Sequence, residues 1–138
     1  MKYLRNFNES VEEYTDVEKI QILCLDNLSY LIDSGLIFRV YKEDSTTGIS
    51  IFLEKDLNTM TQFNLVWDDI SSDFIPFLHI LSDRYSIFKD KIRFLAYLPN
   101  SKAVRKDFLV SDVLNDTIII EEPYMISKII IVLDKKAK

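Results

Sequence analysis

Apolar residues recur at spacings of three and four between residues 15 and 34, which is the pattern of an amphipathic helix. The first turn carries a capping box, in which the Thr15 hydroxyl accepts from the Glu18 N–H and the Glu18 carboxylate accepts in return. Gly35 follows, and glycine readily adopts the left-handed conformation that ends many helices. We therefore predict a first helix over 15–34, with an apolar stripe of Val17, Ile20, Cys24, Leu28 and Leu31.

Three later segments alternate apolar and polar residues, as strands do. Segments 36–43 and 49–55 alternate on either side of a short polar turn at 44–48, so we predict that they form a hairpin. The segment 61–67 is predicted as a third strand because it alternates in the same way, through Phe63, Leu65 and Trp67.

A second helix is predicted after the third strand, and its first residue stays open. If Asp68 or Asp69 caps it, Pro76 lies inside the helix, removes one hydrogen bond and bends it. If Asp73 is the cap, Pro76 lies in the first turn, where proline is well tolerated. The apolar stripe is the same in both cases and consists of Phe74, Phe77 or Leu78, Leu81 and Tyr85.

The C-terminal part of the chain predicts three more strands. Segment 91–98 is a strand closed by a proline, and 100–115 is a polar connection with a short helical turn near 104–109. Segments 117–121 and 126–133 are the last two strands. The final one contains Ile129-Ile130-Ile131-Val132, a β-branched run that is apolar on both faces, so we place it in the centre of the sheet.

The element order is therefore α-β-β-β-α-β-β-β, which predicts an α+β fold. We expect a mainly antiparallel sheet with two amphipathic helices packed on one face. The length of 138 residues suits one domain, and we divide the chain into an N-terminal arm (1–14), a single α+β domain (15–134) and a basic tail (135–138). Six residues are expected to be buried together: Cys24, Leu28, Phe38, Leu81, Phe94 and Ile130.

Net charge and cysteine content narrow the classes of function. The formal net charge of −5 disfavours general binding to nucleic acid, because an acidic protein repels phosphate backbones. The single cysteine, Cys24, excludes an intrachain disulfide. No apolar run approaches the roughly 18 residues of a membrane span, and the first ten residues lack the apolar stretch of a secretion signal. We therefore expect no membrane association and no secretion by a signal peptide.

No group of residues forms a known catalytic or metal-binding motif. His79 has Asp83 four residues later, a spacing that suits a general base, but a histidine on a helix surface is the simpler interpretation. Asp68, Asp69 and Asp73 form an acidic cluster that helix capping explains. We expect no metal and no cofactor. The enzymatic alternative, a small metal-dependent nuclease or hydrolase, rests on Glu121, Glu122, Asp134 and Lys136.

Aromatic and basic residues are the remaining candidates for a binding surface. The chain has nine Phe, seven Tyr and one Trp, more than we place in the core, and aromatic side chains anchor many protein interfaces. We expect Tyr41, Tyr97 and Tyr124 to stay partly exposed. A second candidate is a basic stripe that would meet an acidic partner surface or phosphate; it comprises Lys102, Arg105 and Lys106, with Arg84, Lys89, Lys91 and Arg93 near them in sequence.

Two short motifs resemble those of uncharacterised small proteins of large tailed bacteriophages. One is the opening Met1-Lys2-Tyr3-Leu4-Arg5-Asn6-Phe7-Asn8-Glu9-Ser10, since those proteins often begin with M-K and then F-N-E-S or Y-N-E-S. The other is Trp67-Asp68-Asp69-Ile70 followed by Phe74-Ile75-Pro76-Phe77-Leu78. Together they cover about a fifth of the chain. The resemblance indicates an origin and carries no established chemistry.

A further likeness concerns the N-terminal arm. Phage internal proteins can carry a short capsid-targeting segment that is removed after a glutamate, and Phe7 and Glu9 are similar to such a site. With the resemblance, the leading hypothesis is a non-enzymatic phage-type accessory protein that binds another protein in the host cytoplasm or the virion. The alternatives are the nuclease or hydrolase above and a nucleic-acid-associated factor that uses the basic stripe.

Overall fold

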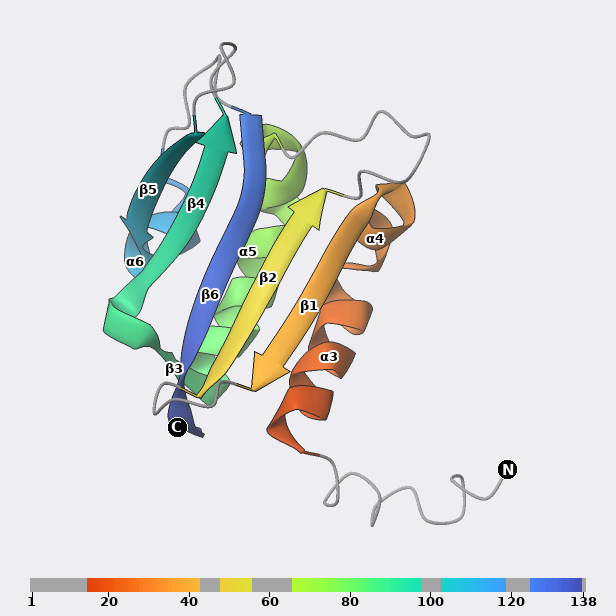
Figure 1. Ribbon diagram of the computed structural model, residues 1–138, viewed down its shortest axis with the longest axis vertical. Coiled ribbons are helices and arrows are strands. Elements are labelled where there is room, and N and C mark those ends of the chain that lie inside the picture. Colours follow the sequence, from red (N-terminus) through yellow and green to blue (C-terminus); the bar gives the residue numbers. More distant parts are fainter. Residues whose placement is uncertain (1–14, 43–47, 56–65, 98–102, 119–124, 138) are drawn as a thin grey trace.

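The computed structural model describes residues 15–42, 48–55, 66–97, 103–118 and 125–137, which form an antiparallel sheet with helices (Figure 1). The helices are α3 (Asp16–Asn27), α4 (Ser29–Ser34), α5 (Trp67–Arg84) and α6 (Val110–Leu114), with a 3-10 turn η1 at Phe88–Asp90. The strands are β1 (Leu36–Lys42), β2 (Ile49–Lys55), β3 (Tyr85–Ile87), β4 (Lys91–Tyr97), β5 (Ala103–Leu109) and β6 (Met125–Ala137).

Strand β6 lies at the centre of the sheet, as its β-branched run predicts. The strand order is β1-β2-β6-β4-β5, with β3 also paired to β6, and every pair is antiparallel. Ile129 lies opposite Leu53 of β2 on one side and opposite Phe94 of β4 on the other. Because β6 comes last in the chain, the sheet closes only when this segment inserts between β2 and β4.

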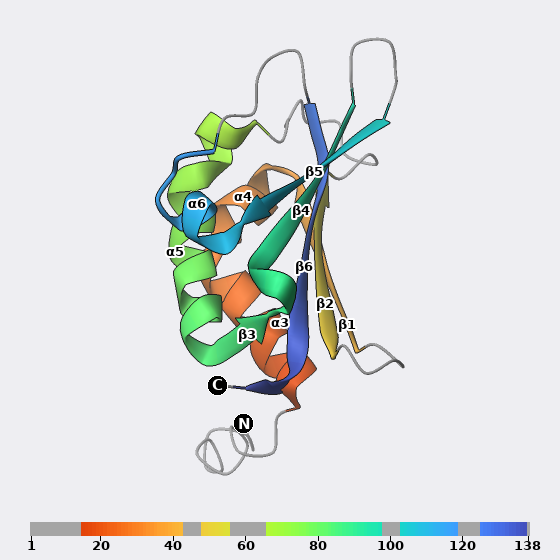
Figure 2. The same cartoon turned by 90° about the vertical axis from the view of Figure 1, so that its left-hand side faces the viewer.

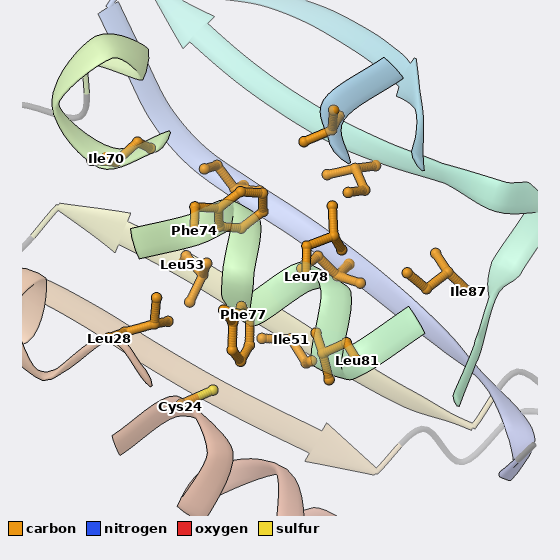
Figure 3. Packing of buried hydrophobic residues seen from close by; sticks show 14 of the residues in the cluster. Cys24, Leu28, Ile51, Leu53, Ile70, Phe74, Phe77, Leu78, Leu81 and Ile87 are labelled. Carbon is orange, nitrogen blue, oxygen red and sulfur yellow. The ribbon is translucent and has the colours of Figure 1, made fainter. Parts of the chain in front are cut away.

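All four helices of the described residues lie on one side of the sheet, and the predicted α+β architecture is confirmed (Figure 2). One hydrophobic cluster fills the space between helices and sheet (Figure 3). There Cys24 and Leu28 face Phe77 of α5, above Ile51 and Leu53 of β2, and all five are buried. Burial raises the pKa of the Cys24 thiol to about 12, so this cysteine is a structural, unreactive group.

The predicted first helix is present but divided in two. Its capping box is confirmed, with the Glu18 N–H donating to Thr15 Oγ1 (3.2 Å) and the Thr15 N–H donating to Glu18 Oε1 (3.2 Å). Leu28 leaves helical geometry between α3 and α4. The Asn27 side chain donates to the carbonyl oxygen of Leu23 (2.9 Å), and such side-chain competition favours a helix end. Gly35 ends α4 with φ of 125°, as predicted.

The second helix begins earlier than its aspartates predict. Val66 occupies the N-cap position without a side-chain hydrogen bond, so none of Asp68, Asp69 and Asp73 caps α5. Asp68 and Asp69 lie in the first turn, where their charges favour the positive end of the helix dipole. Pro76 lies inside the helix, with its ring exposed.

Three predicted segments differ from the structure at the residues that it describes. Trp67 belongs to α5 and not to a strand, while 61–65 lie outside the described residues. The prediction of a helical turn near 104–109 is wrong, because this segment is β5 and the following five residues form α6. Thr117 and Ile118 are not in a strand; the Thr117 N–H and hydroxyl both donate to the Asp112 carbonyl oxygen (3.0 and 3.1 Å) and close α6 instead.

The predicted core is correct except at two positions. Leu81 and Phe94 are buried with Cys24 and Leu28, and Phe38 packs against the cluster while partly exposed. Ile130 is partly exposed, because the alternation of β6 turns Ile129 and Ile131 toward the helices and Ile130 away from them. The predicted arm, 1–14, lies outside the described residues, and the predicted basic tail belongs to β6 as far as Ala137.

Candidate functional site

The sheet has a second face that no described helix covers, which we call the open face (Figure 2). One row of opposed residues crosses it from strand to strand. Arg39 lies opposite Phe52, Phe52 opposite Ile130, Ile130 opposite Arg93, and Arg93 opposite Asp107. Opposed residues in an antiparallel sheet point to the same side, so these five side chains share the open face.

The centre of the open face is apolar. Phe52, Ile130 and Val132 are half-buried, on the side of the sheet away from the described helices. Tyr41 extends this region along β1, with 44% of its surface exposed and its ring packed edge-on against Phe52 (centroids 5.4 Å apart). Leu109 is exposed at the opposite edge, on β5. The open face therefore carries aromatic and aliphatic surface in contact with solvent.

Charged side chains near β1 form the first of two ionic groups on this face. Glu54 forms salt bridges on both sides, with Arg39 Nε 3.2 Å from Oε1 and Lys128 Nζ 3.6 Å from Oε2. Lys128 also lies over the Phe52 ring, 5.2 Å from its centroid. A side-chain hydrogen bond with Tyr41 and the negative charge of Glu54 raise the pKa of the Arg39 guanidinium. We call Arg39, Glu54 and Lys128 the Glu54 network.

The second ionic group surrounds a hollow of about 290 Å³ on the same face. Two apolar residues of β6, Ile130 and Val132, line it together with Phe88. Its other lining residues are charged, four basic and one acidic: Lys89, Lys91, Arg93, Arg105 and Asp107. We call this the basic hollow.

Asp107 holds the two arginines of the basic hollow. Arg105 donates through Nε to Oδ1 (3.2 Å) and through Nη2 to Oδ2 (2.9 Å), a two-point contact that fixes the plane of its guanidinium. Arg93 Nε lies 3.7 Å from Oδ1, beyond a normal hydrogen bond. The bond from Arg105, with its charge and those of Arg93 and Lys91, lowers the pKa of the Asp107 carboxyl. Asp107 therefore stays ionised at neutral pH.

One wall of the basic hollow is an insertion between β3 and β4. Ile87 lies opposite Leu133, and Arg93 lies opposite Ile130. The chain therefore advances by six residues from Ile87 to Arg93 while β6 advances by only three. The three extra residues form η1, in which Lys89 and Asp90 have φ of 57° and 54°. A non-glycine residue in this left-handed region costs roughly 1–2 kcal/mol. Lys89 Nζ lies over the Phe88 ring, 5.3 Å from its centroid.

The structure brings together only part of the predicted basic stripe. Arg105 lies beside Lys89, Lys91 and Arg93 in the basic hollow. Lys106 does not join them, because it lies opposite the core residue Phe94 and so faces the helix side. Arg84 is in the last turn of α5. Four predicted binding or targeting residues lie outside the described part of the chain: Lys102, Tyr124, Phe7 and Glu9. Of Tyr97 only the backbone is described.

The predicted catalytic alternatives do not converge in the described residues. His79 is exposed on α5, and its carbonyl oxygen accepts from the Ser82 hydroxyl (3.0 Å). Within 15–42, 48–55, 66–97, 103–118 and 125–137, no three His, Cys, Asp or Glu side chains are placed to share a metal ion. Of the proposed nuclease residues, Asp134 is partly exposed in β6, whereas Glu121, Glu122 and the Lys136 side chain are not described.

Phe52, Ile130 and Val132 were not predicted as surface residues. A signal for Phe52 was present, because the alternation that turns Ile51 and Leu53 inward must turn Phe52 outward. The apolar run in β6 gave no such signal, since a strand covered on both faces would have the same sequence.

Comparisons with known proteins yielded no relative. No protein family matches the chain, and no curated protein or solved structure is significantly similar to it. Among the helices of the described residues, none combines the length and the apolar character required to cross a membrane.

Proposed function

We propose that this chain is a non-enzymatic, phage-type accessory protein that binds another protein through the open face. It would act in the host cytoplasm or as a component of the virion. The observation that supports this most is the apolar centre of the open face, formed by Tyr41, Phe52, Ile130 and Val132 and flanked by two ionic groups. An apolar patch with a polar rim is typical of protein interfaces.

The charges of the open face favour an acidic partner. Among the described side chains around the apolar centre, six are basic and three are acidic: Arg39, Lys128, Lys89, Lys91, Arg93 and Arg105, and Glu54, Asp107 and Asp134. A second copy docked face to face would set the basic hollow of each chain against a positive surface, which costs free energy. We therefore infer a different protein, with carboxylates around an apolar patch.

Protein is a better match than nucleic acid for this face. Four of the six basic residues are in ion pairs with Glu54 or Asp107, which reduces the local positive charge. The rest of the chain is acidic, with a net charge of −5, and repels a long phosphate backbone.

Exposed residues on the two sides of the molecule allow a controlled test. The open-face variant carries Tyr41→Ala and Leu109→Ala, and the helix-side control carries Leu25→Ala and Tyr30→Ala, all at exposed positions. Proteins that co-purify with each chain from expressing cells are quantified by mass spectrometry. We expect the open-face variant to recover roughly a tenth or less of a specific partner, because aromatic anchors carry much of the binding energy.

The control should recover that partner as the wild-type chain does, with both variants melting within a few degrees of wild type. Recovery of every partner by the open-face variant, or loss from the control alone, would contradict the proposal. Retention of a nucleic acid in place of a protein would favour the alternative of a nucleic-acid-associated factor.

A further inference from the structure

The basic hollow has more hydrogen-bond donors than its own carboxylate can satisfy. A guanidinium has five N–H donors, and a carboxylate accepts at about four positions. Asp107 accepts two hydrogen bonds from Arg105 and lies 3.7 Å from Arg93, while Lys89 and Lys91 add two ammonium groups to the same lining. The hollow therefore retains positive charge and directed donors after its internal ion pairs have formed.

The floor of the basic hollow restricts which anion fits. Ile130 and Val132 supply apolar surface directly beside the arginines. A volume of about 290 Å³ lies at the low end of the range for small-molecule sites, so a side chain fits better than a cofactor.

We propose that the basic hollow receives the carboxylate of a glutamate or aspartate side chain of the partner protein, with a neighbouring apolar residue against Ile130 and Val132. This inference rests on the proposed function and specifies its partner. Arg93 and Arg105 are the binding residues. Asp107 is a positioning residue, because it holds the Arg105 guanidinium by two points of contact.

The backbone of η1 supports the same assignment. Lys89 and Asp90 keep left-handed conformations that cost free energy, and strain of this kind concentrates at functional sites. Its effect here is to place Phe88 and Lys89 at the wall of the hollow, beside β6.

A pair of dipeptides tests the proposal on the full chain. N-acetyl-Glu-Leu-amide and its uncharged match, N-acetyl-Gln-Leu-amide, are titrated into ¹⁵N-labelled protein, and backbone amide and arginine Nε–H signals are followed by NMR. We expect the Glu dipeptide to shift the signals of Arg93, Arg105, Ile130 and Val132 with millimolar affinity. The Gln dipeptide should bind roughly tenfold more weakly, because a charge-assisted hydrogen bond is lost.

Variants at two basic residues of the open face distinguish binding in the basic hollow from attraction to positive charge in general. Arg105→Gln should weaken binding of the Glu dipeptide by roughly tenfold, whereas Lys128→Gln, a basic residue of the Glu54 network, should leave it within about twofold. Equal binding of both dipeptides, or equal loss in both variants, would overturn the proposal. Tighter binding of inorganic phosphate or of an eight-residue oligothymidylate at the same signals would also overturn it, in favour of a phosphate ligand.

The two proposals fail in different ways. If the Glu dipeptide does not bind but the Tyr41→Ala, Leu109→Ala variant loses its partner, the open face binds protein without a carboxylate in the hollow. If the dipeptide binds as expected while that variant keeps every partner, the carboxylate site is real and the proposed partner surface is wrong.

Discussion

Leu28 shows how one residue contributes to the fold. It is fully buried at the junction of α3 and α4, where it packs toward α5 and β2 (Figure 3). We predict that Leu28→Ala lowers the free energy of unfolding by about 2–5 kcal/mol, since it removes buried methyl groups and leaves a cavity. Chemical denaturation measures the loss.

Leu25, three residues earlier in α3, provides the matched control. It is 52% exposed, so Leu25→Ala should change the free energy of unfolding by no more than about 0.5 kcal/mol. Similar losses for the two substitutions would show that the position of α3 against the sheet is wrong.

At the scale of elements, α5 carries a proline in its interior and not in its first turn, where proline is well tolerated. Pro76 is the tenth of 18 residues, exposed, and without an N–H to donate to the preceding turn. We predict that Pro76→Ala raises the free energy of unfolding by about 1–3 kcal/mol by restoring this bond. Thermal and chemical denaturation test it. A loss of stability instead would mean that the bend at Pro76 is needed to pack α5 on the sheet.

Local signals predicted the elements whose pattern is unambiguous. The capping box at Thr15 and Glu18, the glycine at Gly35 and the alternation of β1 and β2 each act within a few residues, and each is confirmed. The break at Leu28 was not predicted because the apolar stripe continues across it. The Asn27 side chain donates to the Leu23 carbonyl oxygen beside this break, a contact that a periodicity argument does not weigh.

Segments with a weak pattern were assigned the wrong type. In β5, Val104 and Phe108 alternate with exposed residues, but Lys106 occupies the position between them on the same side and hides the period of two. Trp67 continues an apparent strand alternation into a helix. Its indole N–H donates to Asp116 (2.9 Å), a contact 49 residues away that no local pattern contains.

For the whole molecule, the arrangement of the sheet decides which residues can act together. The basic hollow combines η1, β4, β5 and β6, so the residues from 88–93, 105–107 and 130–132 meet only because β6 inserts beside β4. Sequence proximity predicted that Arg105 would join Lys89, Lys91 and Arg93. It could not predict that Lys106 would face away, because this depends on the register of β5.

The central claim is that the molecule has one face for its core and the other for a partner. Figures 1 and 2 show the division: helices cover one side of the sheet, and β1, β2, β6, β4 and β5 present the other. The claim is tested most directly by asking which side of the chain touches another protein in cells.

Photo-cross-linking answers this question. A benzophenone amino acid is placed at one exposed position per chain, at Tyr41 or Leu109 on the open face and at Leu25 or Tyr30 on the helix side, and adducts are identified by mass spectrometry after irradiation. We predict one dominant adduct with a different protein from both open-face positions and none of it from the helix side. Adducts from Leu25 and Tyr30 alone, or an open-face adduct of twice the chain mass, would contradict the account.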